Sequence, residues 1–221
     1  MRLLVVEDEP RLAAELKAAL EAAGYAVDVA HDGAAADFCV ETEHYDSVIL
    51  DLGLPRIDGL TLLGRWRRTG RTVPVLLLTA RGAWHEKVEG INAGADDYVA
   101  KPFHVEEVIA RVRALIRRAA GHAEAELRCG PITLHVPRAL VFVNDVPVTL
   151  TSHEFRVLSY LMHHRGRVVG QAELIEHVYA QSFDRDSNTV EVFVSRLRRK
   201  LRVDSIKTIR GLGYCLEEPA R

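Results

Sequence analysis

The stretch LLVVEDEP, residues 3 to 10, places four aliphatic residues directly before Glu7, Asp8 and Glu9. Consecutive aliphatic residues without polar alternation are typical of a strand buried on both faces, as in a parallel sheet. Glu9 suits the start of a following helix, because a helix N-terminus attracts negative charge. Glu7 and Asp8 end the strand itself, and clustered carboxylates stay ionised only where a cation lies nearby. The stretch therefore predicts a parallel sheet whose edge holds a positive partner.

The remainder of the first half repeats this alternation of short apolar runs and amphipathic stretches. The predicted strands span residues 3–6, 25–30, 46–51, 73–80 and 96–100. The predicted helices span residues 10–24, 33–43, 59–70, 85–94 and 105–119. Parallel strands need helical crossovers, so the pattern predicts an α/β doubly wound, five-stranded parallel sheet. We expect Gly24 and Gly94 to lie where two of the helices stop.

The ends of the predicted strands carry the residues that suggest chemistry. The first strand ends at Glu7 and Asp8, the third at Asp51, the fourth at Thr79 and the fifth just before Lys101. Ligands bind at the carboxyl ends of strands in such sheets, and oxygen donors without thiolate or imidazole suit Mg²⁺. We therefore expect phosphoryl chemistry, with Asp51 as nucleophile and Asp8 and Glu7 holding the metal. Lys101 and Thr79 would donate to the phosphoryl oxygens.

The second half has a different rhythm. Short alternating runs at residues 128–136, 139–145 and 146–151 predict an antiparallel meander. Thr151, followed three residues later by Glu154, predicts a capping box at the start of a helix. Two further helical stretches and a final hairpin at residues 206–217 complete the order of a winged helix-turn-helix domain.

The chain is therefore expected to contain two domains with different roles. We assign residues 1–118 and 126–221 to them and 119–125 to a short linker. The first range carries 15 Lys and Arg against 19 Asp and Glu, the second 14 against 11. The three cysteines have no paired spacing, which argues against a disulfide framework and a zinc site. Because no leader-like segment or long apolar run is visible, we expect a cytoplasmic protein without a membrane span.

Several motifs together resemble the two-component response regulators of the OmpR/PhoB type. The first half matches with VVEDEP, VILDLGLPRIDG, LLLTAR and ADDYVAKPF, in order and at similar spacing. The second half matches with LTSHEFRVLSYL, DSNTVEVFVSRLRRKL and TIRGLGYCL. The resemblance covers nearly the whole chain. It implies a flavodoxin-like receiver domain followed by a smaller winged helix-turn-helix α+β domain that binds double-stranded DNA.

The resemblance implies a role for each acid of the first half. A sensor histidine kinase would phosphorylate Asp51. Mg²⁺ would be bound by Asp8, by Asp51 and by the backbone carbonyl of Gly53, with Glu7 assisting through water. The phosphorylated protein would act as a transcription factor in the cytoplasm.

The resemblance also implies a switch and a dimer. Thr79 would move to the phosphoryl group while Tyr98 rotates inward behind it, which alters the surface of the fourth helix, the fifth strand and the fifth helix. A homodimer would form through this surface on phosphorylation and would bind tandem half-sites. The charged residues expected at the dimer interface are Lys87, Asp97, Glu107 and Arg111.

The third helix of the second half, at about residues 186–202, carries a basic run toward its C-terminus. By resemblance, one face of this helix enters the major groove, and the hairpin reaches the minor groove. The residues expected to contact DNA are Glu191, Ser195, Arg196, Arg198, Thr208 and Arg210. The residues expected to pack this helix are Val190, Val192, Val194, Leu197 and Leu201. Phe193 stands where many relatives have a polar or histidine side chain, and relatives meet RNA polymerase through the loop at about 180–185.

Two other classes of protein compete with this interpretation. A phosphatase or phosphotransferase can also use a nucleophilic Asp with Mg²⁺, but such enzymes typically carry a second acid two residues later, where this chain has Gly53. We therefore expect no turnover of small phosphate esters. A DNA-binding protein that ignores phosphorylation is the other alternative. The intact set of acids, Thr79 and Lys101 argues against it.

Overall fold

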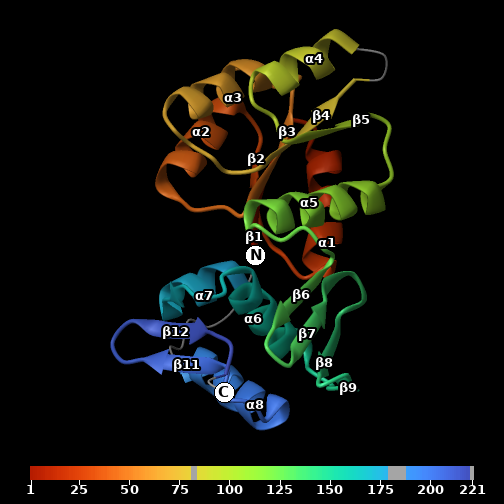
Figure 1. Cartoon of the computed structure of the whole chain (residues 1–221). Helices are drawn as coiled ribbons and strands as arrows, with labels where there is room; N and C mark the ends of the chain where they lie inside the picture. Colours follow the sequence, from red (N-terminus) through yellow and green to blue (C-terminus); the bar gives the residue numbers. More distant parts are fainter. Residues whose placement is uncertain (81–83, 179–187, 220–221) are drawn as a thin grey trace. The chain divides into compact units, whose positions relative to one another are not determined.

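The computed structural model describes residues 1–80, 84–178 and 188–219 (Figure 1). Contacts divide the chain into two compact units, with the division between Ala119 and Ala120. This division lies inside the stretch that we predicted as a linker. We call the unit of Arg2–Ala119 the N-terminal unit and the one that begins at Ala120 the C-terminal unit.

The N-terminal unit is built on a five-stranded sheet in which every pairing is parallel. Its strands are β1 (Arg2–Val6), β2 (Ala26–Ala30), β3 (Ser47–Asp51), β4 (Val75–Thr79) and β5 (Asp97–Ala100). The strand order is β2-β1-β3-β4-β5. Every residue of β3 and of β4 is buried, because helices cover both faces of the sheet. The doubly wound fold that the apolar runs predicted is confirmed.

In the described part of this unit, five helices connect the strands. They are α1 (Pro10–Ala22), α2 (Gly33–Thr42), α3 (Gly59–Arg68), α4 (Trp84–Asn92) and α5 (Val105–Ala119). Helix α1 contacts α5, and α2 contacts α3, so the two pairs cover different faces of the sheet. Gly24 and Gly94, just beyond α1 and α4, both have φ of 99°, a left-handed conformation that favours glycine. They end the helices as predicted and let the chain turn into the next strand.

The C-terminal unit begins with a four-stranded antiparallel sheet. Its strands, in spatial order, are β6 (Glu126–Cys129), β7 (Ile132–His135), β8 (Leu140–Val143) and β9 (Val146–Pro147), with a 3-10 turn η1 (Val136–Arg138) before β8. The run at residues 128–136, which we predicted as one strand, is two. Gly130 has φ of 54°, so the chain turns there and β6 pairs with β7.

Among the described residues, three helices and a second sheet complete the unit, and Figure 1 shows their arrangement. The helices are α6 (Ser152–His163), α7 (Gln171–Val178) and α8 (Asn188–Leu201), and the strands are β10 (Val168–Val169), β11 (Ile206–Ile209) and β12 (Gly213–Leu216). The predicted hairpin is β11 and β12. The sequence did not predict β10, which pairs with β12, because two residues are too short to form a pattern. The predicted winged helix-turn-helix order is confirmed.

Helix α6 begins at the predicted capping box. Thr151 Oγ1 accepts from the N–H of Glu154 at 3.4 Å, and the N–H of Thr151 donates to Glu154 Oε2 at 2.8 Å. Helix α8 buries Val190, Val194, Leu197 and Leu201. Our prediction that Val192 packs with them is wrong, because this side chain is 44% exposed. It lies two residues from Val190 and Val194, which places it off the buried face of the helix.

Candidate functional site

The carboxyl ends of four strands bring the predicted residues of the N-terminal unit together. Lys101, just beyond β5, donates from Nζ to Glu7 Oε2 at 2.7 Å and to Asp51 Oδ2 at 3.0 Å. Glu7 follows β1 and Asp51 ends β3. One oxygen each of Glu7, Asp8 and Asp51 lie within 4.8 Å of one another. Three carboxylates and one ammonium group therefore share a small volume.

Burial strengthens the interactions within this acidic pocket, by which we mean Glu7, Asp8, Asp51, Thr79 and Lys101. Glu7 is only 1% exposed. Burial raises the pKa of Glu7, the hydrogen bond from Lys101 opposes this effect, and the neighbouring charge of Asp51 raises the pKa further. Burial would lower the pKa of Lys101, but the hydrogen bonds to Glu7 and Asp51 outweigh it and raise the pKa. Lys101 therefore stays charged between the two acids.

Two further features suit the pocket to a metal and a phosphoryl group. The hydroxyl of Thr79 is fully buried and has no hydrogen-bond partner among the residues that the structure describes. Its free donor lies at the end of β4, beside the strand that ends in Asp51. All the candidate ligands are oxygens, which is the donor set that Mg²⁺ prefers. The residues present therefore fit Mg²⁺.

The loop after Asp51 is held close to the pocket. A Cβ atom at Gly59 would lie 2.4 Å from the carbonyl oxygen of Asp51, so a larger residue there would displace the strand end. At Gly53 the nearest atom to such a Cβ would be Asp51 Oδ2 at 3.6 Å, an ordinary contact. Asp51, Gly53 and Lys101 line an open cavity of about 860 Å³ together with Leu12 and Phe103. The cavity therefore extends to the end of β3 at Asp51.

The residues predicted for the switch and the dimer lie on one side of the unit. Tyr98, on β5, is half-buried and packs against the core, and Thr79 is two residues further along the paired strands. Arg111 Nη1 donates to Asp97 Oδ2 at 3.1 Å, and Arg111 Nη2 donates to Glu107 Oε1 at 2.7 Å. The side chain of Lys87 lies outside the described residues. Three of the four predicted dimer residues are thus linked by ion pairs within the chain.

The side of the unit that carries the predicted dimer residues also has an apolar part that we did not predict. Val88 and Ile91 on α4 are 46% and 56% exposed. They are spaced three residues apart and therefore share one face of the helix. That spacing was visible in the sequence, but a partly apolar helix in a doubly wound fold is expected to turn such a face toward the sheet.

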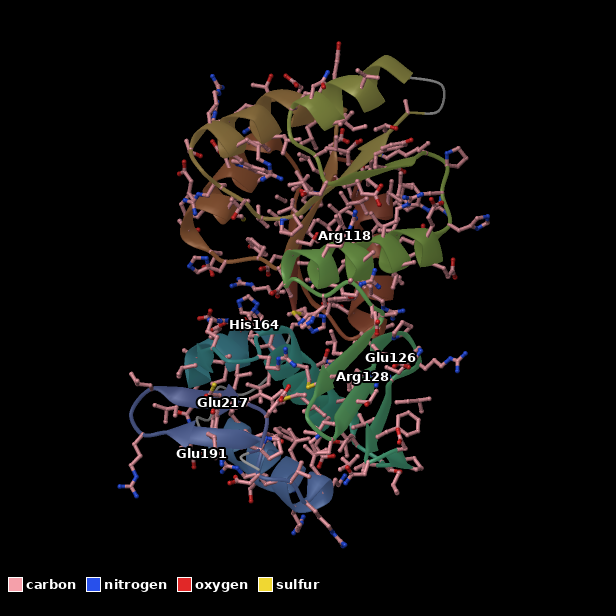
Figure 2. The ribbon with its side chains drawn as sticks, in the orientation of Figure 1. Arg118, Glu126, Arg128, His164, Glu191 and Glu217 are labelled. Atoms are coloured by element: carbon pink, nitrogen blue, oxygen red, sulfur yellow. The ribbon has the colours of Figure 1, made fainter. Side chains whose placement is uncertain are left out.

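In the C-terminal unit, the predicted DNA contacts are of two kinds. Ser195 and Arg196 on α8 and Arg210 in the hairpin are exposed. Glu191, labelled in Figure 2, is exposed near the start of α8, where its carboxylate accepts from Gln171 Nε2 at 3.2 Å. Figure 2 also shows nitrogen-tipped side chains extending outward from the ribbon of α8. These positions suit contact with a nucleic acid.

Arg198 and Thr208 instead form a hydrogen bond with each other. Arg198 Nη2 donates to Thr208 Oγ1 at 2.7 Å and to the carbonyl oxygen of Ile206 at 2.8 Å, and Arg198 Nε donates to the same carbonyl at 3.0 Å. Phe193 stacks on His153 with ring centroids 5.5 Å apart. The loop expected to meet RNA polymerase, at about 180–185, lies outside the described residues.

None of the helices within residues 1–80, 84–178 and 188–219 is both long enough and apolar enough to span a membrane.

Comparison with known proteins assigns both units. Residues 3–113 match the response regulator receiver domain, and residues 145–216 match the family of the transcriptional regulatory protein, C terminal. The two-component response regulator PhoP of Pseudomonas aeruginosa is 45% identical over the full length of both chains. The transcriptional regulatory protein PhoP of Escherichia coli is 42% identical over 98% of this chain and 99% of its own.

Solved structures resemble the N-terminal unit. The receiver domain of the Francisella response regulator 1452 is 36% identical, with a TM-score of 0.52 over 53% of this chain and 98% of its own. A response regulator from Chloroflexus aurantiacus, described as putative, is 40% identical, with a TM-score of 0.51 over 53% of this chain and 98% of its own. Together with the motifs and the fold, these matches show that the chain belongs to the two-component response regulators of the OmpR/PhoB type, transcriptional regulators with a receiver domain and a DNA-binding domain.

Proposed function

We propose that Asp51 is the phosphoacceptor of this regulator and that a sensor histidine kinase is the donor. The observation that carries the proposal is the pair of hydrogen bonds from Lys101 Nζ to Glu7 and Asp51, in a pocket where Asp8 offers a third carboxylate. A carboxylate oxygen of Asp51 attacks the phosphorus of a phosphohistidine. A P–O bond forms, the P–N bond breaks, and the imidazole nitrogen leaves with the electron pair.

The side chains around Asp51 prepare this transfer. Asp8, Asp51 and the carbonyl of Gly53 would hold Mg²⁺ directly, and Glu7 would do so through water. Bound Mg²⁺ offsets the negative charge that gathers on the phosphoryl oxygens. Lys101, already 3.0 Å from Asp51 Oδ2, supplies a second positive charge at the same place. We expect no turnover of a small phosphate ester.

The proposed switch uses the free hydroxyl of Thr79. Once Asp51 carries a phosphoryl group, an oxygen acceptor is available to Thr79, whose Oγ1 is buried without a partner in the described part of the chain. Movement of Thr79 leaves space behind it on the neighbouring strands, and Tyr98 turns into that space. The surface formed by α4, β5 and α5 changes as a result.

This surface is the proposed dimer interface. Val88 and Ile91 offer exposed apolar area, and Asp97, Glu107 and Arg111 offer charges of both signs. Exposed ion pairs contribute about 0 to 1 kcal/mol each, so the apolar residues supply most of the stabilisation. In this proposal the intramolecular pairs exchange partners across a two-fold axis, where Lys87 joins them.

The dimer would place two C-terminal units on tandem half-sites of double-stranded DNA. The exposed face of α8 with Glu191, Ser195 and Arg196 would lie in the major groove, and Arg210 would reach the minor groove. We further propose that the protein acts in the cytoplasm and contacts RNA polymerase through the loop at about 180–185.

Acetyl phosphate with Mg²⁺ tests the proposal on the purified chain. The wild type should gain the mass of one phosphoryl group, and light scattering should show a larger assembly. Asp51→Ala should do neither, while Asp28→Ala serves as a control outside the pocket. A phosphorylated protein whose assembly and DNA affinity are unchanged would favour the alternative of a regulator that ignores phosphorylation.

A further inference from the structure

The basic run of α8 contains cations with two different environments. Arg199 and Arg202 are exposed, and no side-chain hydrogen bond or ion pair joins them to any residue in the part of the chain that the structure describes. Arg198 and Lys200, each adjacent to Arg199, are half-buried and donate hydrogen bonds within the unit. The sequence alone shows five similar cations in this run, and only the structure shows that their environments differ.

Lys200 ties α8 to the start of α6. Its Nζ donates to Glu154 Oε2 at 2.7 Å and to the carbonyl oxygen of Thr149 at 3.1 Å. Glu154 is 1% exposed and belongs to the capping box with Thr151. A lysine held by a buried carboxylate and a carbonyl has little freedom to reach a phosphate outside the unit.

Arg198 ties the other side of α8 to the wing, which we define as the hairpin of β11 and β12. Three of its donor contacts go to β11, two to the carbonyl oxygen of Ile206 and one to Thr208 Oγ1. The opposite edge of the wing is also fixed, because β12 pairs with β10. The two strands approach so closely that a Cβ at Gly213 would lie 2.0 Å from the carbonyl oxygen of Val169 on β10. The base of the wing is therefore held on both edges, and its tip, with Arg210, is left exposed.

Helical geometry explains the division. Val190, Val194, Leu197 and Leu201 form the buried stripe of α8. At 3.6 residues per turn, Arg198 and Lys200 lie on opposite flanks of this stripe, where neighbouring elements can accept their hydrogen bonds. Ser195 and Arg199 are spaced i and i+4 and therefore share the exposed face. Arg202 follows directly after α8 and is exposed as well.

From this arrangement we infer that Arg199 and Arg202 hold DNA phosphates, whereas Arg198 and Lys200 are positioning residues that orient α8 and the wing. This inference rests on the proposed DNA contact through α8 and deepens it. It revises our expectation that Arg198 and Thr208 contact DNA themselves. A phosphate contact releases counterions, so its loss reduces the salt dependence of binding, whereas the loss of a positioning contact does not.

The test uses fluorescence anisotropy with a labelled duplex of random sequence over a range of salt concentrations. Arg199→Gln and Arg202→Gln should each make the slope of log K against log salt less negative by about 0.9. Arg198→Lys keeps the charge but cannot make the forked contacts to Ile206 and Thr208. It should lower the affinity with the slope unchanged, and circular dichroism checks that each variant is folded.

A double-mutant cycle separates positioning from general destabilisation. If Arg198 orients the wing, Arg210→Gln should weaken binding several-fold in the wild type and much less in the Arg198→Lys background. Additive effects, or a slope loss for Arg198→Gln equal to that of Arg199→Gln, would overturn the inference. If the wild-type chain itself showed no salt-dependent affinity for the duplex, the proposed contact with DNA would fail instead.

Discussion

The two units each contain a lysine that donates to a buried glutamate at the same distance. Lys101 Nζ lies 2.7 Å from Glu7 Oε2 in the N-terminal unit, and Lys200 Nζ lies 2.7 Å from Glu154 Oε2 in the C-terminal unit. Both glutamates are 1% exposed, and the two lysine side chains are 29% and 32% exposed. The two Lys–Glu pairs thus have nearly the same distance and exposure, yet we assign reactivity to one pair and a structural role to the other.

The surroundings of the two glutamates account for this difference. Beside Glu7 lies a second carboxylate, Asp51, which shares the same ammonium group. Beside Glu154 lies a donor, the N–H of Thr151. Burial would raise the pKa of Glu154, but the bonds from Lys200 and Thr151 outweigh it and the pKa is lowered. The pKa of Glu7 is raised instead, because burial and the neighbouring charge of Asp51 outweigh the hydrogen bond from Lys101.

The largest expected difference between the pairs is in phosphoryl transfer. Lys101→Met should lower the rate of phosphoryl incorporation from acetyl phosphate by about 100-fold, since it removes a charge aimed at the transferred group. Lys200→Met should leave that rate unchanged. Mass spectrometry of the intact chain over time measures both. Similar rates for the wild type and Lys101→Met would show that the first pair has no chemical role.

Stability should respond in the opposite order. Lys200→Met leaves a buried carboxylate without its cation, which should cost the C-terminal unit about 2 kcal/mol. Lys101→Met should cost the N-terminal unit less, because burial and the charge of Asp51 already disfavour the charged form of Glu7 and raise its pKa. Added Mg²⁺ should stabilise the N-terminal unit of the Lys101→Met variant.

Unfolding of each unit can be followed separately. Both tryptophans, Trp66 and Trp84, belong to the N-terminal unit, so fluorescence during urea unfolding reports on that unit. Hydrogen exchange of peptides from α6 and α8 reports on the other unit. The comparison breaks down if Lys101→Met proves the more damaging substitution to folding, or if Mg²⁺ protects α6 and α8 in the Lys200→Met variant.

The two glutamates should respond to pH with opposite signs. The folded pKa of Glu154 is lowered from its usual 4.5, so the stabilisation is present above about pH 4.5 and is lost as the pH falls through the folded value. Glu154→Gln should therefore be least stable relative to the wild type at neutral pH. The folded pKa of Glu7 is raised from 4.5, so its favourable contribution is present below about pH 4.5 and is lost as the pH rises through the folded value.

Glu7→Gln should consequently match or exceed the wild-type stability at neutral pH, and its advantage should shrink on acidification. The expected differences are about 1 kcal/mol in each direction. Urea titrations of both variants at several pH values measure them. Curves for the two variants that move in the same direction with pH would mean that the surroundings of the two glutamates do not distinguish the sites.

The smallest predicted effect compares two threonines. Thr151→Ala removes the acceptor of the capping box and should cost the C-terminal unit about 1 kcal/mol. Thr79→Ala removes a buried hydroxyl with no partner in the described part of the chain, so it should be neutral or slightly stabilising. Thr79→Ser keeps the hydroxyl and is the matched control. A clear loss of stability in Thr79→Ala alone would indicate that this hydroxyl has a partner in the resting protein.

Sequence reasoning predicted the acidic pocket well because one rule places all of its residues. The carboxyl ends of parallel strands lie at one edge, so Glu7, Asp51, Thr79 and Lys101 could be grouped once the strands were recognised. The alternation of apolar runs and amphipathic stretches predicted the five-stranded sheet, and the spacing of Thr151 and Glu154 predicted the capping box. In each case a local pattern determines the position.

The sequence could not assign partners to the cations of α8. Lys200 meets Glu154, which is 46 residues away, and Arg198 meets a backbone carbonyl that has no sequence signature. Our prediction that Val192 is buried was wrong because we relied on its apolar character and did not consider the helical spacing. Strand β10 was not predicted because its two residues are too short to form a pattern.

The most direct test of the account is to map the phosphoryl group after incubation with acetyl phosphate in the presence and absence of Mg²⁺. Peptide mass spectrometry should find it on Asp51, with incorporation that requires Mg²⁺. A phosphoryl group on another residue, or equal incorporation on Asp51 without the metal, would contradict the claim that the charge shared by Glu7, Asp51 and Lys101 makes this pocket a metal-dependent phosphoacceptor.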